Sequence, residues 1–120
     1  KSVLAFAKSP VGMRMRNAFL NGTLKREQPF VMSIPASEAD PSYPAEETIL
    51  VQGIIDAWFT EGEKLVLVDY KTDRVKEIGE LKKRYEKQLA YYQQALERTT
   101  GKKVKEKIIY SLALDEELVL

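Results

Sequence analysis

The sequence predicts an α/β fold of the α+β type, in which helices flank a sheet. Two apolar, β-branched runs, residues 48–60 and 64–71, lie on either side of a short polar turn that contains Gly62, which is typical of paired antiparallel strands. An apolar stripe over residues 78–96 predicts a long helix, and residues 105–113 are rich in β-branched and aromatic side chains. Strands and helices therefore alternate in the second half of the chain.

The chain begins with two predicted helices and a strand. Residues 3–8 and 12–20 have helical patterns that Pro10 separates, and a strand is expected at residues 27–34. Residues 35–47 hold three prolines, two serines and four acidic residues, so they predict a polar loop without a core pattern.

The hairpin strands and the long helix complete the layout. The strands have no polar face, so we expect both to be central and covered on both sides. The helix stripe recurs at steps of three and four residues and ends before Gly101. Its members are Ile78, Leu81, Tyr85, Leu89, Tyr92 and Leu96.

Composition restricts the chemistry. With 120 residues and 44% hydrophobic content, the chain can form one domain, residues 1–120, and no segment is apolar enough to span a membrane. The chain has no cysteine and no histidine, which excludes thiol nucleophiles, Ser-His-Asp chemistry and Cys/His metal sites. Any metal would have oxygen ligands, which favours Mg²⁺, Mn²⁺ or Ca²⁺. Because it starts without methionine, we expect it to be part of a larger protein.

The hairpin brings three charged residues together. With the turn near Gly62, Asp56 is expected opposite or diagonal to Asp69, and Lys71 emerges on the same face as Asp69. Carboxylates at the edge of an apolar region are costly unless they are paired or metal-bound, so a divalent cation shared by both acids is one interpretation. A structural ion-pair cluster with Lys71 is the other, and the residue types alone leave both open.

Two polar residues accompany the helix stripe. Gln88 and Tyr92 are one turn apart, so an amide and a phenol can project together towards the sheet. Taken alone, the pattern favours a structural interpretation, with Tyr92 as a core residue and Gln88 as a surface residue.

Four motifs follow one another along the chain: Arg26-Glu27-Gln28-Pro29-Phe30, Gly53-Ile54-Ile55-Asp56, Val68-Asp69-Tyr70-Lys71-Thr72-Asp73 and Gln88-Leu89-Ala90-Tyr91-Tyr92. In this order they resemble the RecB-type branch of the PD-(D/E)xK nucleases, closest to the C-terminal nuclease domain of AddA-type helicase–nuclease subunits. Together they cover nearly the whole chain. The resemblance implies a restriction-endonuclease-like core with a central mixed sheet flanked by helices.

The resemblance also implies a role for each motif residue. Asp56 and Asp69 would bind Mg²⁺, which Mn²⁺ can replace, and the carbonyl of Tyr70 would add a ligand. Lys71 would orient or help to deprotonate the attacking water and offset charge on the phosphorane. Gln88 and Tyr92 would support the site and the DNA strand beside it.

The implied protein is a bacterial, cytoplasmic deoxyribonuclease, exonuclease rather than endonuclease, in an ATP-dependent helicase–nuclease that acts in double-strand break repair and recombination. Its implied partners are DNA, the helicase portion of the same polypeptide and an AddB-like subunit, with no membrane. Relatives with an iron–sulfur cluster need four cysteines, which this chain lacks. The branch usually carries an upstream histidine, also absent, so we expect the 120 residues alone to bind metal weakly and to cleave slowly. The alternatives are an inactive module for DNA binding or subunit docking and a stand-alone restriction-like endonuclease.

Overall fold

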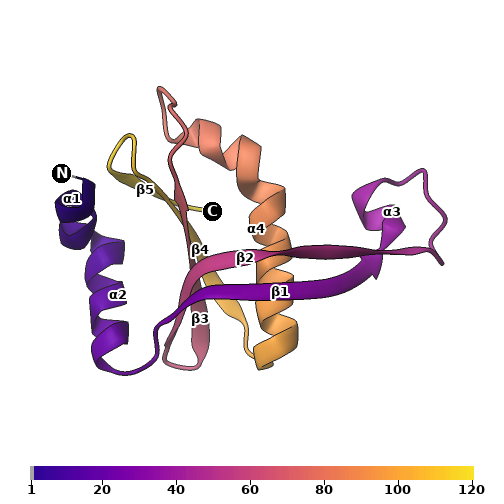
Figure 1. Ribbon diagram of the computed structural model, residues 1–120, viewed down its shortest axis with the longest axis horizontal. Helices are drawn as coiled ribbons and strands as arrows, with labels where there is room; N and C mark the ends of the chain where they lie inside the picture. Colours follow the sequence, from indigo (N-terminus) through magenta and orange to yellow (C-terminus); the bar gives the residue numbers. More distant parts are fainter. Residues whose placement is uncertain (1) are drawn as a thin grey trace.

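The computed structural model describes residues 2–120, which form a mixed five-stranded sheet with helices on both sides (Figure 1). The strands are adjacent in chain order, and β3 and β4 are parallel while the other pairs are antiparallel. This arrangement confirms the predicted α+β fold with a central mixed sheet. The strands are β1 (Lys25–Pro35), β2 (Thr48–Glu61), β3 (Lys64–Lys71), β4 (Val104–Ser111) and β5 (Glu116–Val119).

Three longer helices cover the two faces of the sheet. The helices α1 (Ser2–Lys8) and α2 (Pro10–Leu20) lie on one side, and α4 (Gly79–Thr100) lies on the other (Figure 1). The Ser9 hydroxyl caps α2 by accepting a hydrogen bond from the Gly12 N–H at 3.0 Å, and Pro10 fills a first-turn position where no N–H is needed. In the described chain, no helix is both long enough and apolar enough to cross a membrane.

Strand β3 is the centre of the core because both of its faces are covered. Val66 and Val68 pack with the side chains of α2, whereas Leu65 and Leu67 pack with those of α4. This alternation is the period-two pattern of an extended strand between two apolar layers. It confirms that β3 is covered on both sides, and it places Asp69, two residues beyond Leu67, towards α4.

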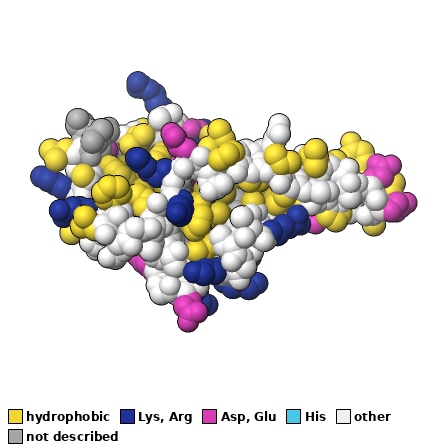
Figure 2. Space-filling view, turned by 60° about the horizontal axis from the view of Figure 1, so that its bottom comes forward, with side chains coloured by type: hydrophobic (Ala, Val, Ile, Leu, Met, Phe, Trp, Pro, Cys, Tyr) yellow, Lys and Arg dark blue, Asp and Glu magenta, His cyan; other side chains and the backbone are white. Residues whose placement is uncertain are grey.

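The first half of β2 differs from the sequence expectation. It pairs with β1 in a long two-stranded arm that extends away from the rest of the sheet (Figure 1). One face of the arm packs on α4 through Met32 and Ile34, while Val31, Leu50 and Ile54 are exposed on the other face. Figure 2 shows hydrophobic side chains on the surface along the arm. The expectation that β2 is covered on both sides is therefore wrong for this half, because nothing in the described chain lies over the second face of the arm.

Two short elements were not predicted. The segment expected to be a loop, residues 35–47, contains the one-turn helix α3 (Ala36–Ala39) at the tip of the arm, where the Ala36 N–H donates to the Glu47 carbonyl at 2.8 Å. The last predicted strand ends at Ser111, earlier than expected, and the chain then turns through Asp115, which has a φ of 53°, into β5. β5 covers the open edge of β4.

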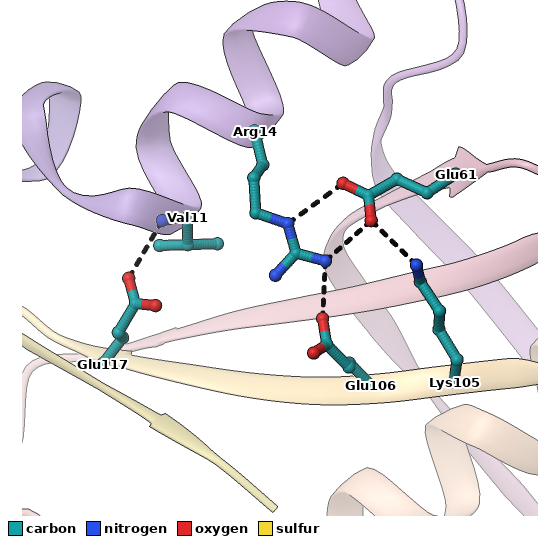
Figure 3. A network of polar contacts seen from close by, with 6 residues as sticks. All are labelled: Val11, Arg14, Glu61, Lys105, Glu106 and Glu117. Carbon is teal, nitrogen blue, oxygen red and sulfur yellow. Dashed lines mark hydrogen bonds and ion pairs between the residues drawn. The ribbon is translucent and has the colours of Figure 1, made fainter.

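A network of ion pairs holds α2 to the sheet, close to the turn between β2 and β3. The Arg14 guanidinium donates to Glu61 through Nε at 3.0 Å and Nη2 at 2.8 Å, and also to Glu106 on β4 (Figure 3). Lys105 pairs with the same Glu61 carboxylate at 3.0 Å. We call these four residues the Arg14 network; it joins α2, β2 and β4.

Candidate active site

The strand register brings the two predicted acids together. Ala57 pairs with Val68 in the antiparallel β2–β3 ladder, and continuing this register by one residue sets Asp56 opposite Asp69. The Tyr70 N–H donates to Asp56 Oδ2 at 2.8 Å, so the ladder ends in a bond to a carboxylate side chain. The two strands therefore present both carboxylates at the end of β3, as the hairpin pattern indicated.

Asp69 is an almost fully buried carboxylate, 2% exposed. Its burial, together with the nearby negative charge of Asp56, raises its pKa to about 6 even though the Lys71 ammonium acts in the opposite direction. The Lys71 Nζ lies 2.8 Å from Asp69 Oδ2. A single lysine therefore does not fully offset the cost of holding this carboxylate ionised.

Lys71 has two further partners besides Asp69. Its Nζ donates to Gln88 Oε1 on α4 at 2.9 Å and lies 3.9 Å from the centre of the Tyr85 ring. A cation over an aromatic face is attracted by the ring quadrupole. The ammonium is thus held from three sides, by a carboxylate, an amide and a ring.

The ring beneath Lys71 is itself fixed by a residue of the loop that follows β3. The Tyr85 hydroxyl donates to Asp73 Oδ2 at 2.7 Å, and Arg84 pairs with the same oxygen at 2.9 Å. From the sequence, Tyr85 was expected only as a member of the apolar stripe, and Asp73 had no predicted role. The available signal was position, because Tyr85 precedes Gln88 by one helical turn and therefore shares its face.

Tyr92 lies deeper than Gln88, against the β1–β2 arm. It is buried and meets the Phe30 ring edge-to-face at 5.4 Å between ring centres. Its pKa is raised by burial and by the charges of Asp69 and Asp56. A Cβ added to Gly53 would lie 3.2 Å from Phe30 and 3.4 Å from Tyr92, so the bare glycine lets both rings approach the strand.

The donor set of this site fits a hard divalent cation. Asp56, Asp69 and the Tyr70 carbonyl offer oxygen atoms only, and a cation between the two carboxylates would offset the burial and the Asp56 charge that raise the pKa of Asp69. A cavity of about 230 Å³ adjoins Asp56 and is also lined by Arg26, Glu27 and Tyr70. Within residues 2–120, no group of three or more acidic, histidine or cysteine side chains is placed to hold an ion, so the remaining ligands would come from water, substrate or other protein.

Comparison with known proteins supports the interpretation of the motifs. Residues 7–118 match the PD-(D/E)XK nuclease superfamily. The chain is also similar to an ATP-dependent helicase/nuclease subunit of Clostridium botulinum, with 46% identity in strain 657 and 45% in strain Loch Maree, and to that of Clostridium kluyveri, with 42% identity. Each similarity extends over 117 residues, which is 94% of this chain but 9% of the relative. The family predicted from the motifs is therefore confirmed: the chain belongs to the PD-(D/E)XK nuclease superfamily and is homologous to the matching part of these helicase/nuclease subunits.

Proposed function

We propose that this chain is a Mg²⁺-dependent DNA nuclease domain, residues 1–120, of a larger ATP-dependent helicase–nuclease that acts in double-strand break repair and recombination. The observation that carries the proposal is the convergence of Asp56, Asp69 and Lys71 at the end of β3, with the buried Asp69 carboxylate beside the Lys71 ammonium. The relatives that contain a matching segment are named ATP-dependent helicase/nuclease subunits. Mn²⁺ is the expected substitute ion.

The proposed partners follow from the relatives' length and names. The helicase portion would lie in the same polypeptide, because the matched segment is 9% of each relative. An AddB-like subunit would complete the complex, DNA would be the substrate, and the complex would act in the bacterial cytoplasm. Exonuclease activity is proposed over endonuclease activity.

In this proposal Asp56, Asp69 and the Tyr70 carbonyl hold the cation. The bound ion would supply positive charge against the phosphate and lower the pKa of a water molecule that attacks phosphorus. Lys71 contributes a second positive charge where negative charge develops on the phosphate oxygens. Hydrolysis joins the water oxygen to phosphorus, breaks one P–O ester bond and returns a proton to the leaving oxygen.

Gln88 and Tyr85 hold Lys71 in position. Because the Gln88 amide oxygen and the Tyr85 ring both hold the ammonium, the lysine loses little freedom when DNA binds. Tyr92 closes the site towards the arm by packing on Phe30. These contacts suit a preorganised site better than a surface ion pair.

The decisive experiment separates Lys71 from the two acids. Lys71→Ala in the full-length protein is expected to lower Mg²⁺-dependent DNA cleavage by about 100-fold or more, because a positive charge at the phosphate is lost, while metal binding persists. Cleavage of labelled single- and double-stranded DNA measures the rate, and Mn²⁺ titration followed by NMR line broadening at residues 54–56 and 68–71 measures binding. Lys64→Ala, at the exposed start of the same strand, is the matched control.

The structural ion-pair alternative makes the opposite prediction. If Lys71 only neutralises Asp69, its removal leaves a buried carboxylate unpaired and destabilises the fold by about 3 kcal/mol without a specific effect on chemistry. Strong destabilisation together with near-normal cleavage would reject the catalytic role. An inactive module for DNA binding or docking would show metal-independent DNA binding and no cleavage by the wild-type protein.

A further inference from the structure

A groove of about 360 Å³ lies between α4 and the first half of β2 and opens next to the proposed catalytic residues. Among the described residues, its wall carries three aromatic rings, the Gln88 amide and one ammonium, and no acidic side chain. The lining residues are Phe30, Val51, Gln52, Gly53, Lys87, Gln88, Tyr91 and Tyr92. This volume is at the low end of the range of small-molecule sites in proteins.

The groove and the active site share a wall. Gln88 lines the groove and also accepts the hydrogen bond from Lys71 at 2.9 Å, so the groove begins one side chain away from the lysine. Tyr92 lines the groove as well, and burial and the negative charges of Asp69 and Asp56 raise the pKa of its hydroxyl. A ligand in the groove would therefore adjoin whatever is bound at Lys71.

The groove is preformed by contacts on both of its sides. On the arm side, Gly53 leaves room for Phe30, which packs edge-to-face on Tyr92. Two contacts tie α4 to the arm, from Arg98 Nη1 to the Ser33 carbonyl at 2.8 Å and from Lys87 Nζ to the Ala39 carbonyl at 3.4 Å. The half-buried Tyr91 lines the groove beside these contacts.

The chemistry of the wall selects the class of ligand. A flat, neutral ring can stack on Tyr91, the Gln88 amide can hydrogen-bond its edge, and Lys87 can pair with an attached anion. Base stacking on aromatic side chains beside a cation is the general mode by which proteins bind single-stranded nucleic acid. A paired base cannot use the groove, because its faces are covered by its neighbours in the duplex.

We propose that this groove is a subsite for one unpaired nucleotide of the substrate strand, whose base stacks on Tyr91 while a neighbouring phosphate lies at Lys71. The proposal rests on the proposed nuclease function, and it adds a contact between Tyr91 and one base of the substrate strand. Stacking on Tyr91 then strengthens binding of the substrate, whereas Asp56, Asp69 and Lys71 act in the cleavage of the phosphodiester bond.

The test couples a protein change to a substrate change. In the full-length protein, Tyr91→Leu is expected to raise KM for a single-stranded oligonucleotide about tenfold and to leave kcat within about twofold, since one stacking contact is lost. Tyr91→Phe keeps the ring and should behave like the wild type. Tyr43→Leu, an exposed tyrosine in the loop after α3, is the matched control.

The second part of the test removes a base from the substrate and leaves the tyrosine ring in place. In a series of oligonucleotides with one abasic site moved along the strand, one position should raise KM for the wild type about tenfold and have no effect in Tyr91→Leu, because ring and base form a single interaction. The subsite is overturned if the abasic site raises KM equally for the wild type and Tyr91→Leu at every position. It is also overturned if KM for the intact oligonucleotide is unchanged in Tyr91→Leu. A change of KM and kcat in Tyr91→Leu that is the same for intact and abasic substrates assigns Tyr91 a purely structural role and also overturns it.

Failure of the subsite can be told apart from failure of the nuclease assignment. If the wild type does not cleave DNA in Mg²⁺ or Mn²⁺, the proposed function fails, and fluorescence anisotropy with the same oligonucleotides and variants still measures the coupling between ring and base. If it cleaves but shows no coupling, only the subsite fails.

Discussion

Two clusters of charged residues lie at opposite ends of β3: one contains Asp69 and Lys71, and the other is the Arg14 network. In both, a carboxylate and a cation are separated by the same distance, but the pKa of the carboxylate is shifted in opposite directions. Asp69 lies 2.8 Å from the Lys71 ammonium, and Glu61 lies 2.8 Å from the Arg14 guanidinium. Yet the pKa of Asp69 is raised to about 6, whereas that of Glu61 is lowered to about 2. Proximity of an opposite charge therefore does not decide the ionisation of the acid.

Burial and the number of cations account for the difference. Glu61 receives hydrogen bonds from Arg14 and an ion pair from Lys105, and its side chain is 32% exposed, so the charged form is well solvated. Asp69 is nearly inaccessible and faces a second carboxylate, Asp56. The cations of the Arg14 network are thus sufficient to keep Glu61 ionised, whereas Lys71 does not fully compensate the charge of Asp69. We infer that the first cluster serves stability and the second is arranged for an additional cation.

The strongest test of this comparison is a neutral isostere in each cluster. Asp69→Asn is expected to lower DNA cleavage about 100-fold or more, because one anionic ligand is lost while the shape is kept. It should not lower the free energy of unfolding at neutral pH, since the fold disfavours the charge of Asp69. Glu61→Gln should do the reverse, with normal cleavage and reduced stability. Cleavage assays and urea unfolding measure the two effects.

An equal loss of cleavage in both variants would remove the contrast, because Glu61 lies at the far end of β3 from the site. Reduced stability in Asp69→Asn with retained cleavage would assign Asp69 to the fold in place of the chemistry.

Much of the Asp69 site could be predicted from the sequence because it depends on local pattern. The hairpin signal at Gly62 sets the register that places Asp56 opposite Asp69, and the strand period places Lys71 beside Asp69. The helical period likewise places Gln88 and Tyr92 on one face of α4. These inferences need only turn length and side-chain alternation.

The unpredicted features depend on contacts between distant segments. Ile55 packs with the side chains of α4, but Ala57 and Phe59 pack on the opposite face, so the inward face of β2 changes around Asp56. Opposite this point Glu27 has a φ of 51°, a left-handed conformation that no glycine in the sequence signals there. The Arg14 network could not be predicted for the same reason. Its contacts join Arg14 to Glu61 and Glu106, which lie 47 and 92 positions later in the chain.

A smaller effect is expected from breaking the Arg14 network itself. Arg14→Ala should reduce the free energy of unfolding by about 2 kcal/mol, because several charge-assisted hydrogen bonds are lost and the Glu61 and Glu106 carboxylates lose their common partner. Thermal and urea unfolding measure the loss, and Mg²⁺-dependent cleavage below the melting temperature should stay normal. Arg16→Ala, an exposed arginine on the same helix, is the control and should change stability by less than about 0.5 kcal/mol. If both variants unfold alike, the network does not hold α2 to the sheet.

The smallest effect, and the most direct measure of the comparison, is the pH dependence of stability in metal-free buffer. The folded pKa of Asp69 lies above its unfolded value of 3.8, so the folded protein binds the proton more tightly and gains stability from this group as pH falls from about 7 to 5. The folded pKa of Glu61 lies below its unfolded value of 4.5, so stability from this group is lost as pH falls from about 4.5 towards 2.

Each variant should therefore diverge from the wild type in its own pH window. In urea unfolding with EDTA, the free energy of unfolding of the wild type should rise by about 1 kcal/mol relative to Asp69→Asn between pH 7 and 5. Between pH 4.5 and 3 it should fall by about 1 kcal/mol relative to Glu61→Gln, after allowance for solvent screening of a partly exposed pair. Saturating Mg²⁺ should reduce the first difference, because a bound cation favours the ionised form of Asp69, and should leave the second unchanged. Parallel stability curves for the wild type and Asp69→Asn between pH 7 and 5 would show that the Asp69 carboxylate is fully compensated by Lys71, and the two clusters would then be alike.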